Sequence, residues 1–199
     1  MIRTLTAALA ATVLAAPLAA EPVPYTFDAS HSQVIFSYNH LGFSTTYGMF
    51  SGFEGEIMFD EENPENSSVS VSMPVTMMFT GWEQRDQHFM SEDFFNASAQ
   101  ADAGNDMVSF ESTSIQVTGE NTANITGNLT MNGITNEVVL ETTLNQSQPF
   151  PFGPNEGVPT LGFDATTTLS REAFGVGAFA PAVGDEVEVM ISLEAQQAS

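Results

Sequence analysis

Apolar and polar residues alternate over long stretches of this chain, and that period of two restricts its fold more than any other feature. Between Val69 and Phe79 every odd position is apolar, whereas most even positions hold serine or threonine. Successive side chains of a β-strand point to opposite faces, so this run predicts one long, half-buried strand. Shorter runs of the same kind predict roughly eight or nine strands in all; they lie at Val34–Tyr38, Ile125–Met131, Val138–Leu144, Leu161–Leu169 and Val187–Leu193.

The connections between these runs carry turn signals. Asn132-Gly133 stands between two alternating runs and predicts a tight hairpin. The apolar positions change from even at Phe110 to odd at Ile115, which predicts a bulge near residues 112–114. Four prolines between residues 146 and 160 predict a long loop that could serve as a lid.

One stretch has helical character. Residues 80–97 form the predicted helical segment, in which Ser91 is placed to cap a turn that begins with Glu92 and Asp93. The remainder predicts an all-β protein whose antiparallel sheet buries its apolar face on itself, either as a sandwich or as a closed barrel. A barrel of about eight strands can enclose an elongated apolar ligand. The alternative is a core filled by side chains.

Charge excludes whole classes of partner. The chain has 25 acidic residues against three arginines and no lysine, for a net charge of −22. Nucleic acids and polybasic docking on anionic lipid both need a basic face, so neither fits. The 42% of hydrophobic residues suffices for a folded core.

This acidic excess indicates a halophilic protein. Raising NaCl from dilute buffer towards molar concentrations is expected to raise the thermal midpoint, because salt screens repulsion among the carboxylates. Thermal unfolding monitored by circular dichroism at several salt concentrations measures this. A thermal midpoint that stays constant or falls as NaCl rises would contradict adaptation to high salt.

The first 20 residues have the character of a secretory signal peptide. Arg3 precedes an apolar run from Leu5 to Leu18, and small residues follow. We therefore expect one mature domain over residues 21–199, periplasmic or secreted, without stable membrane insertion. The absence of cysteine excludes disulfides and thiol chemistry.

Short motifs in a fixed order resemble a known family. They are Tyr25–Ser32, His40–Phe43, Gly48–Gly55, Phe59-Asp60, Arg85–Phe89, Asp93–Phe95, Phe110–Thr113, Gly127–Gly133 and Arg171–Gly175. The series is similar to the YceI-like family of secreted polyisoprenoid-binding proteins. The resemblance implies a lipocalin-like antiparallel barrel whose elongated pocket holds an isoprenoid lipid. Relatives commonly carry a basic residue where this chain has Asn136-Glu137, which argues against recognition of a pyrophosphate head.

The candidate ligand-binding residues lie on the predicted apolar faces, on the aromatic segment around the helix and after the strand that ends near Ser170. They are Phe36, Tyr38, Phe50, Met73, Val75, Met77, Phe79, Arg85, Asp86, His88, Phe89, Phe94, Phe95, Phe110, Leu129, Met131, Phe163, Arg171 and Phe174. Methionine and phenylalanine suit a flexible polyene, because both adapt to irregular chain shapes. The same residues are also typical of an ordinary core.

Two polar groups have alternative interpretations. The first group is Arg85, Asp86 and His88, for which three roles are open. It could be a buried ion pair that fastens the helical segment, or it could contact a ligand. In the third role, Asp86 and His88 are an acid and a base that act with Ser91 as nucleophile. Arg171 either caps one end of the barrel or pairs with an acidic side chain.

The three histidines give no metal-binding spacing. His31, His40 and His88 are far apart in sequence and belong to no known ligand motif, so no metal is expected. His31 is expected to fasten the first strand together with Asp28.

These observations favour a secreted or periplasmic, non-enzymatic binding protein, acting as a monomer or homodimer without a cofactor. Its expected partner is a neutral isoprenoid, a quinone such as ubiquinone or a prenol, held for transport, storage or sequestration. The alternatives are a hydrolase-like enzyme that uses Asp86 and His88, and a stress-related structural protein with a filled core.

Overall fold

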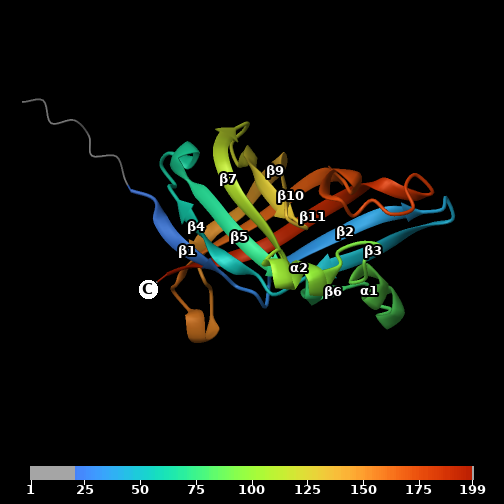
Figure 1. Cartoon of the computed structure of the whole chain (residues 1–199). Helices are drawn as coiled ribbons and strands as arrows, with labels where there is room; N and C mark the ends of the chain where they lie inside the picture. Colours follow the sequence, from blue (N-terminus) through green and yellow to red (C-terminus); the bar gives the residue numbers. More distant parts are fainter. Residues whose placement is uncertain (1–20, 199) are drawn as a thin grey trace, which may run out of the picture.

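The computed structural model describes residues 21–198, and β-strands dominate that part of the chain (Figure 1). The predicted signal peptide lies outside the described residues. The strands are β1 (Val23–Phe27), β2 (Gln33–His40), β3 (Ser44–Phe50), β4 (Glu54–Phe59), β5 (Ser68–Pro74), β6 (Met78–Phe79), β7 (Met107–Val117), β8 (Thr122–Met131), β9 (Ile134–Pro149), β10 (Pro159–Ser170) and β11 (Val183–Gln197). The α-helices are α1 (Glu83–Phe89) and α2 (Ala97–Ala103), and short 3-10 turns lie at Pro64–Asn66, Val75–Met77, Gly153–Asn155 and Glu172–Phe174.

The sheet closes into an antiparallel barrel, which confirms the predicted fold class. Its strand order is β1-β4-β5-β7-β8-β9-β10-β11-β2-β3-β6, and β1 also pairs with β11, so eight strands form a ring. The long strand β11 pairs with β2 along most of its length and with β1 at its C-terminal end. Strands β2, β3 and β6 therefore continue the wall beyond the ring (Figure 1).

The prediction of one strand from Val69 to Phe79 is wrong. Strand β5 ends at Pro74, which cannot donate a hydrogen bond to a ladder, and the 3-10 turn Val75–Met77 follows. This turn shifts the alternation by one residue, so Met78 is buried in β6 while Met77 and Phe79 are exposed.

The predicted helical segment is only partly helical. Helix α1 covers Glu83–Phe89, and residues 91–95 form turns rather than a second capped helix. The Ser91 hydroxyl donates to the carbonyl oxygen of His88 at 2.7 Å. Helix α2 was not predicted, because its alanine-rich sequence shows no apolar period.

The turn predictions differ in their outcomes. Asn132 and Gly133 have φ values of 55° and 73° between β8 and β9, which confirms the tight hairpin. A register shift between Ser112 and Ser114 confirms the bulge. The predicted loop over 146–160 was too wide, because β9 and β10 stay paired up to Pro149 and Pro159.

The core extends along the barrel in two clusters. The larger one gathers aromatic side chains of β2, β3 and the segment from Phe89 to Phe95, and the smaller one surrounds Ile57, Phe59 and Leu161. Among residues 21–198, neither helix has the length and apolarity needed to cross a bilayer.

Candidate functional site

A cavity of about 220 Å³ lies inside the barrel, and almost no polar atom reaches its surface. Inward-facing residues of β10 line it at alternate positions, from Phe163 through Ala165, Thr167 and Leu169 to Arg171 just after the strand. Eight residue steps along a strand span about 26 Å at ~3.3 Å per residue. The cavity is therefore elongated, and its shape suits a chain better than a compact ring.

The structure brings most of the candidate ligand-binding residues together around this cavity. Those that line it are Phe36, Tyr38, Phe50, Met73, Phe89, Phe94, Phe95, Phe110, Leu129, Met131, Phe163 and Arg171. Those that do not are Val75, Met77, Phe79, Arg85, Asp86, His88 and Phe174. Val75 and Phe174 are buried elsewhere in the core, whereas Met77 and Phe79 point outwards because of the turn after Pro74.

Other lining residues were missed as site residues although their strands were predicted. They include Val108, Ile115, Ile125, Val138, Leu140, Ala165, Val187, Val189, Ile191 and Leu193. Their signal was the same alternation that predicted the strands. The alternation identified which side chains point inwards, but it could not distinguish residues that line a cavity from residues of a filled core.

Two glycines shape the wall by leaving room for phenylalanine rings. A Cβ atom at Gly48 would lie 2.3 Å from Cζ of Phe36, and one at Gly127 would lie 2.3 Å from Cζ of Phe110. The tip of each ring therefore occupies the space that a side chain on the neighbouring strand would fill.

Arg171 lies at one end of the cavity, where the interpretation as a cap of the barrel places it. It is buried, and its guanidinium donates to backbone carbonyls of Gly184 (2.8 Å), Val176 (2.9 Å), Val183 (2.9 Å) and Ala178 (3.3 Å). Within residues 21–198, no carboxylate forms an ion pair with it. Pairing with an acidic side chain was thus the wrong alternative.

Four of the five N–H groups of Arg171 are used in these bonds, so one on Nη2 remains unpaired within residues 21–198. Burial lowers the pKa of the Arg171 guanidinium, while the nearby Asp185, Tyr38 and Glu172 oppose that shift. Tyr38 also lines the cavity. Arg171 and Tyr38 therefore lie near each other at one end of a cavity whose surface is almost entirely apolar.

Arg85, Asp86 and His88 do not assemble into a reactive group. Arg85 donates from Nε to the Thr80 hydroxyl at 2.9 Å, and Asp86 accepts from the Thr80 backbone N–H at 2.9 Å. His88 instead contacts Asp93, with 2.9 Å between Nε2 and Oδ2. The first two residues fasten the start of α1 to the end of β6 through Thr80, without the predicted buried ion pair.

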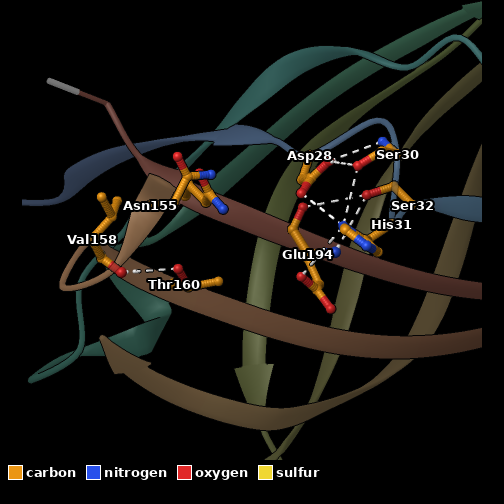
Figure 2. A network of polar contacts seen from close by, with 9 residues as sticks. Asp28, Ser30, His31, Ser32, Asn155, Val158, Thr160 and Glu194 are labelled. Atoms are coloured by element: carbon orange, nitrogen blue, oxygen red, sulfur yellow. Dashed lines mark hydrogen bonds and ion pairs between the residues drawn. The ribbon is translucent and has the colours of Figure 1, made fainter. Parts of the chain in front are cut away.

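The polar network around His31 joins the first turn to β11 (Figure 2). His31 Nδ1 lies 2.9 Å from Asp28 Oδ2 and 4.0 Å from Glu194 Oε2, while the Ser32 hydroxyl donates to the Glu194 carbonyl at 3.3 Å. His31 thus fastens the first strand, as predicted. Within residues 21–198, one group has a spacing that could hold a metal ion, and it consists of Asp28, His31 and Glu194. The other two histidines, His40 and His88, are not part of this group.

This network is expected to make stability depend on pH. A hydrogen bond to Asp28 raises the pKa of His31 above 6.5, and hydrogen bonds from Ser30 and then His31 lower the pKa of Asp28 below 3.8. The stability that His31 contributes is fully present below its pKa in the unfolded chain and is lost as pH rises through its pKa in the folded protein. The stability that Asp28 contributes is lost as pH falls through the pKa of Asp28 in the folded protein.

His31→Gln should therefore lower the thermal midpoint more at about pH 5 than at about pH 9. Paired thermal melts of the variant and the wild type at each pH measure this. An equal difference at both pH values would show that His31 adds nothing as a cation. The side chain is largely exposed, so we expect a small effect.

Comparison with known proteins places the chain in a family. The model of the YceI-like domain matches residues 25–195. The chain belongs to the YceI-like family. A UPF0312 protein of Ectopseudomonas mendocina is 38% identical over 192 residues, which cover 94% of this chain and 96% of that protein. A UPF0312 protein of Pseudomonas aeruginosa is 35% identical and covers 84% and 82% of the two chains.

Solved structures show the same fold as this YceI-like chain. Burkholderia cenocepacia BcnA aligns with a TM-score of 0.72 and 25% identity over 84% of this chain and 98% of its own. A polyisoprenoid binding domain from Saccharophagus degradans, implicated in plant cell wall breakdown, aligns with a TM-score of 0.66 and 10% identity over 88% and 99%. At that identity, the second likeness concerns the fold alone.

Proposed function

We propose that this YceI-like protein is a periplasmic or secreted carrier that holds a neutral isoprenoid lipid, a quinone or a prenol, in its barrel for transport, storage or sequestration. The observation that carries the proposal is the elongated cavity inside the barrel, whose surface is almost entirely apolar. The binding domain from Saccharophagus degradans, which has the same fold, supports a polyisoprenoid as the ligand class.

The tail accounts for most of the expected affinity. Each methylene transferred from water into an apolar cavity contributes about 0.8 kcal/mol, so a few isoprene units suffice without any ionic contact. Methionine and phenylalanine side chains in the wall, such as Met73, Met78 and Phe95, adjust to an irregular chain. Binding then requires no chemical reaction, and the protein acts as a carrier rather than an enzyme.

The rival functions lack a comparable observation. A hydrolase needs a hydroxyl within hydrogen-bond reach of a base, but the Ser91 hydroxyl bonds a backbone carbonyl and His88 contacts Asp93. A structural protein with a filled core does not require an empty channel along the barrel, and this interior holds about 220 Å³ of free space.

The head group should be neutral because, among residues 21–198, no cation that lines the cavity is free to bind a phosphate. Arg85 lies outside the wall, and Arg171 keeps one N–H after donating to four carbonyls. A diphosphate needs several charge-assisted hydrogen bonds to offset its lost hydration. One carbonyl or hydroxyl oxygen needs only one or two donors, such as those of Arg171 and Tyr38 at one end of the cavity.

We therefore expect a ubiquinone to bind more tightly than a polyprenyl diphosphate of equal tail length. Calorimetric titrations of both ligands at the same salt concentration test this. Tyr38→Phe should weaken quinone binding by roughly three- to tenfold, which is the contribution of one net hydrogen bond. The same substitution should leave the affinity for a prenyl hydrocarbon unchanged. Tighter binding of the diphosphate would contradict the proposal. Native mass spectrometry of protein purified from its own host would name the lipid.

A further inference from the structure

Large apolar side chains stand exposed at the end of the barrel where Arg171 lies. They come from the β2–β3 turn and from the loop over residues 175–182, which lie at the same end in Figure 1. Phe43 at the tip of the turn is 88% exposed and Phe179 in the loop is 55% exposed. We call this set the aromatic end; its members are Leu41, Phe43 and Phe179.

Direct contacts hold these segments beside one another. The Leu41 N–H donates to the Ala182 carbonyl at 3.1 Å, which joins the turn to the loop. The Phe179 ring lies 6.1 Å from the His88 ring and 6.0 Å from the Phe94 ring, which joins the loop to the helical segment. The aromatic end is therefore one surface rather than scattered residues.

The aromatic end is continuous with the cavity. Phe94, which Phe179 contacts, lies 4.9 Å from Phe89 between ring centroids, and Phe89 lies 6.1 Å from Tyr38. Phe94, Phe89 and Tyr38 all line the cavity. A chain of ring contacts thus leads from the exposed Phe179 to the end of the cavity where Tyr38 lies.

The acidic residues around the aromatic end determine which kind of membrane surface it can contact. Glu83, Glu92 and Asp93 are exposed on the adjoining helical segment, Arg171 is buried, and the chain has no lysine. Such a surface repels anionic headgroups. Exposed aromatic rings are favoured at the boundary between lipid headgroups and acyl chains. An uncharged or zwitterionic bilayer satisfies both conditions.

We infer that the aromatic end docks on the surface of a zwitterionic bilayer, so that lipid passes between membrane and cavity without crossing water. This inference rests on the proposed function, since it names the partner from which that ligand is taken. Docking is peripheral and reversible. Phe43 and Phe179 enter the boundary layer while the barrel stays in water.

The test uses vesicles of phosphatidylcholine. Docking is expected to carry the protein with the vesicles in flotation. Phe43→Ser should weaken vesicle binding at least about fivefold, and Phe43→Ser with Phe179→Ser should weaken it further. Phe152→Ser is the matched control, because Phe152 is 70% exposed in the β9–β10 loop at another end of the molecule (Figure 1).

Several results would overturn the inference. They are no binding of the wild type to phosphatidylcholine, an equal loss in Phe152→Ser, tighter binding to phosphatidylglycerol vesicles, and a dimer in sedimentation that Phe43→Ser dissociates while vesicle binding stays unchanged. The last result would make a second copy of the chain the occupant.

Ligand titration without vesicles separates this inference from the proposed function. Phe43→Ser should keep the wild-type affinity for a ubiquinone in that assay but slow its transfer between vesicles. If no isoprenoid binds while docking persists, the proposed function fails and the docking surface stands. If the ligand binds but the wild type never docks, the inference fails alone.

Discussion

Thr167→Trp is expected to weaken isoprenoid binding by tenfold or more. Thr167 points into the cavity between Ala165 and Leu169, and an indole at that position fills much of the 220 Å³ and divides the channel. A tenfold loss corresponds to about 1.4 kcal/mol, less than the transfer free energy of two methylenes that would no longer be buried. Isothermal titration with a ubiquinone measures it.

The adjacent threonine provides the matched control. Thr168 has the same chemistry on the same strand but is exposed on the outer face, where it pairs with Glu188 of β11. Thr168→Trp should bind the ligand as the wild type does, and both variants should show wild-type circular dichroism. Equal affinity of the two variants would show that the ligand does not occupy this cavity.

The alternation of apolar residues was enough to predict the barrel wall. Side chains repeat every two residues along a strand, and one buried face in an antiparallel sheet leaves a clear pattern. Runs such as Val34–Tyr38 and Val187–Leu193 therefore predicted their strands and their inward residues. The turn at Asn132-Gly133 was equally clear, because two positive φ angles select those residues.

The same pattern failed where the backbone left the strand for one turn. Val69–Phe79 shows unbroken odd periodicity, yet the 3-10 turn after Pro74 turns Met77 and Phe79 outwards. Pro74 was the available signal, since proline within an apparent strand argues for a break. Phe79 lies on the edge strand β6 opposite Met49, and both side chains are exposed.

The polar partners were the least predictable part. Sequence proximity suggested that Asp86 and His88 act together as an acid and a base. Residues two apart on a helix point to different sides, so Asp86 contacts Thr80 and His88 contacts Asp93. The bonds of Arg171 to backbone carbonyls had no sequence signal, because every residue supplies a carbonyl. Such contacts depend on the path of the 176–184 backbone, which residue types alone do not specify.

Arg171→Met should destabilise the folded protein by about 3 kcal/mol. The substitution removes the donors for four carbonyls, three of which lie within 3.0 Å of the guanidinium, in a region from which water is largely excluded. Each buried acceptor left without a partner costs about 1 kcal/mol or more, and the lost bonds are charge-assisted. Urea unfolding monitored by circular dichroism gives the difference in the free energy of unfolding.

Arg85→Met is the control, since Arg85 is the other arginine of the predicted mature chain and is only partly buried. It donates to the Thr80 hydroxyl and carbonyl, so we expect a loss of about 1 kcal/mol. Equal losses in the two variants would contradict a special role for Arg171. Arg171→Lys should recover little, because an ammonium has three donors on one atom and cannot reach carbonyls spread from Val176 to Gly184. The guanidinium is needed because its planar fork holds the loop that carries Phe179 against the end of the barrel.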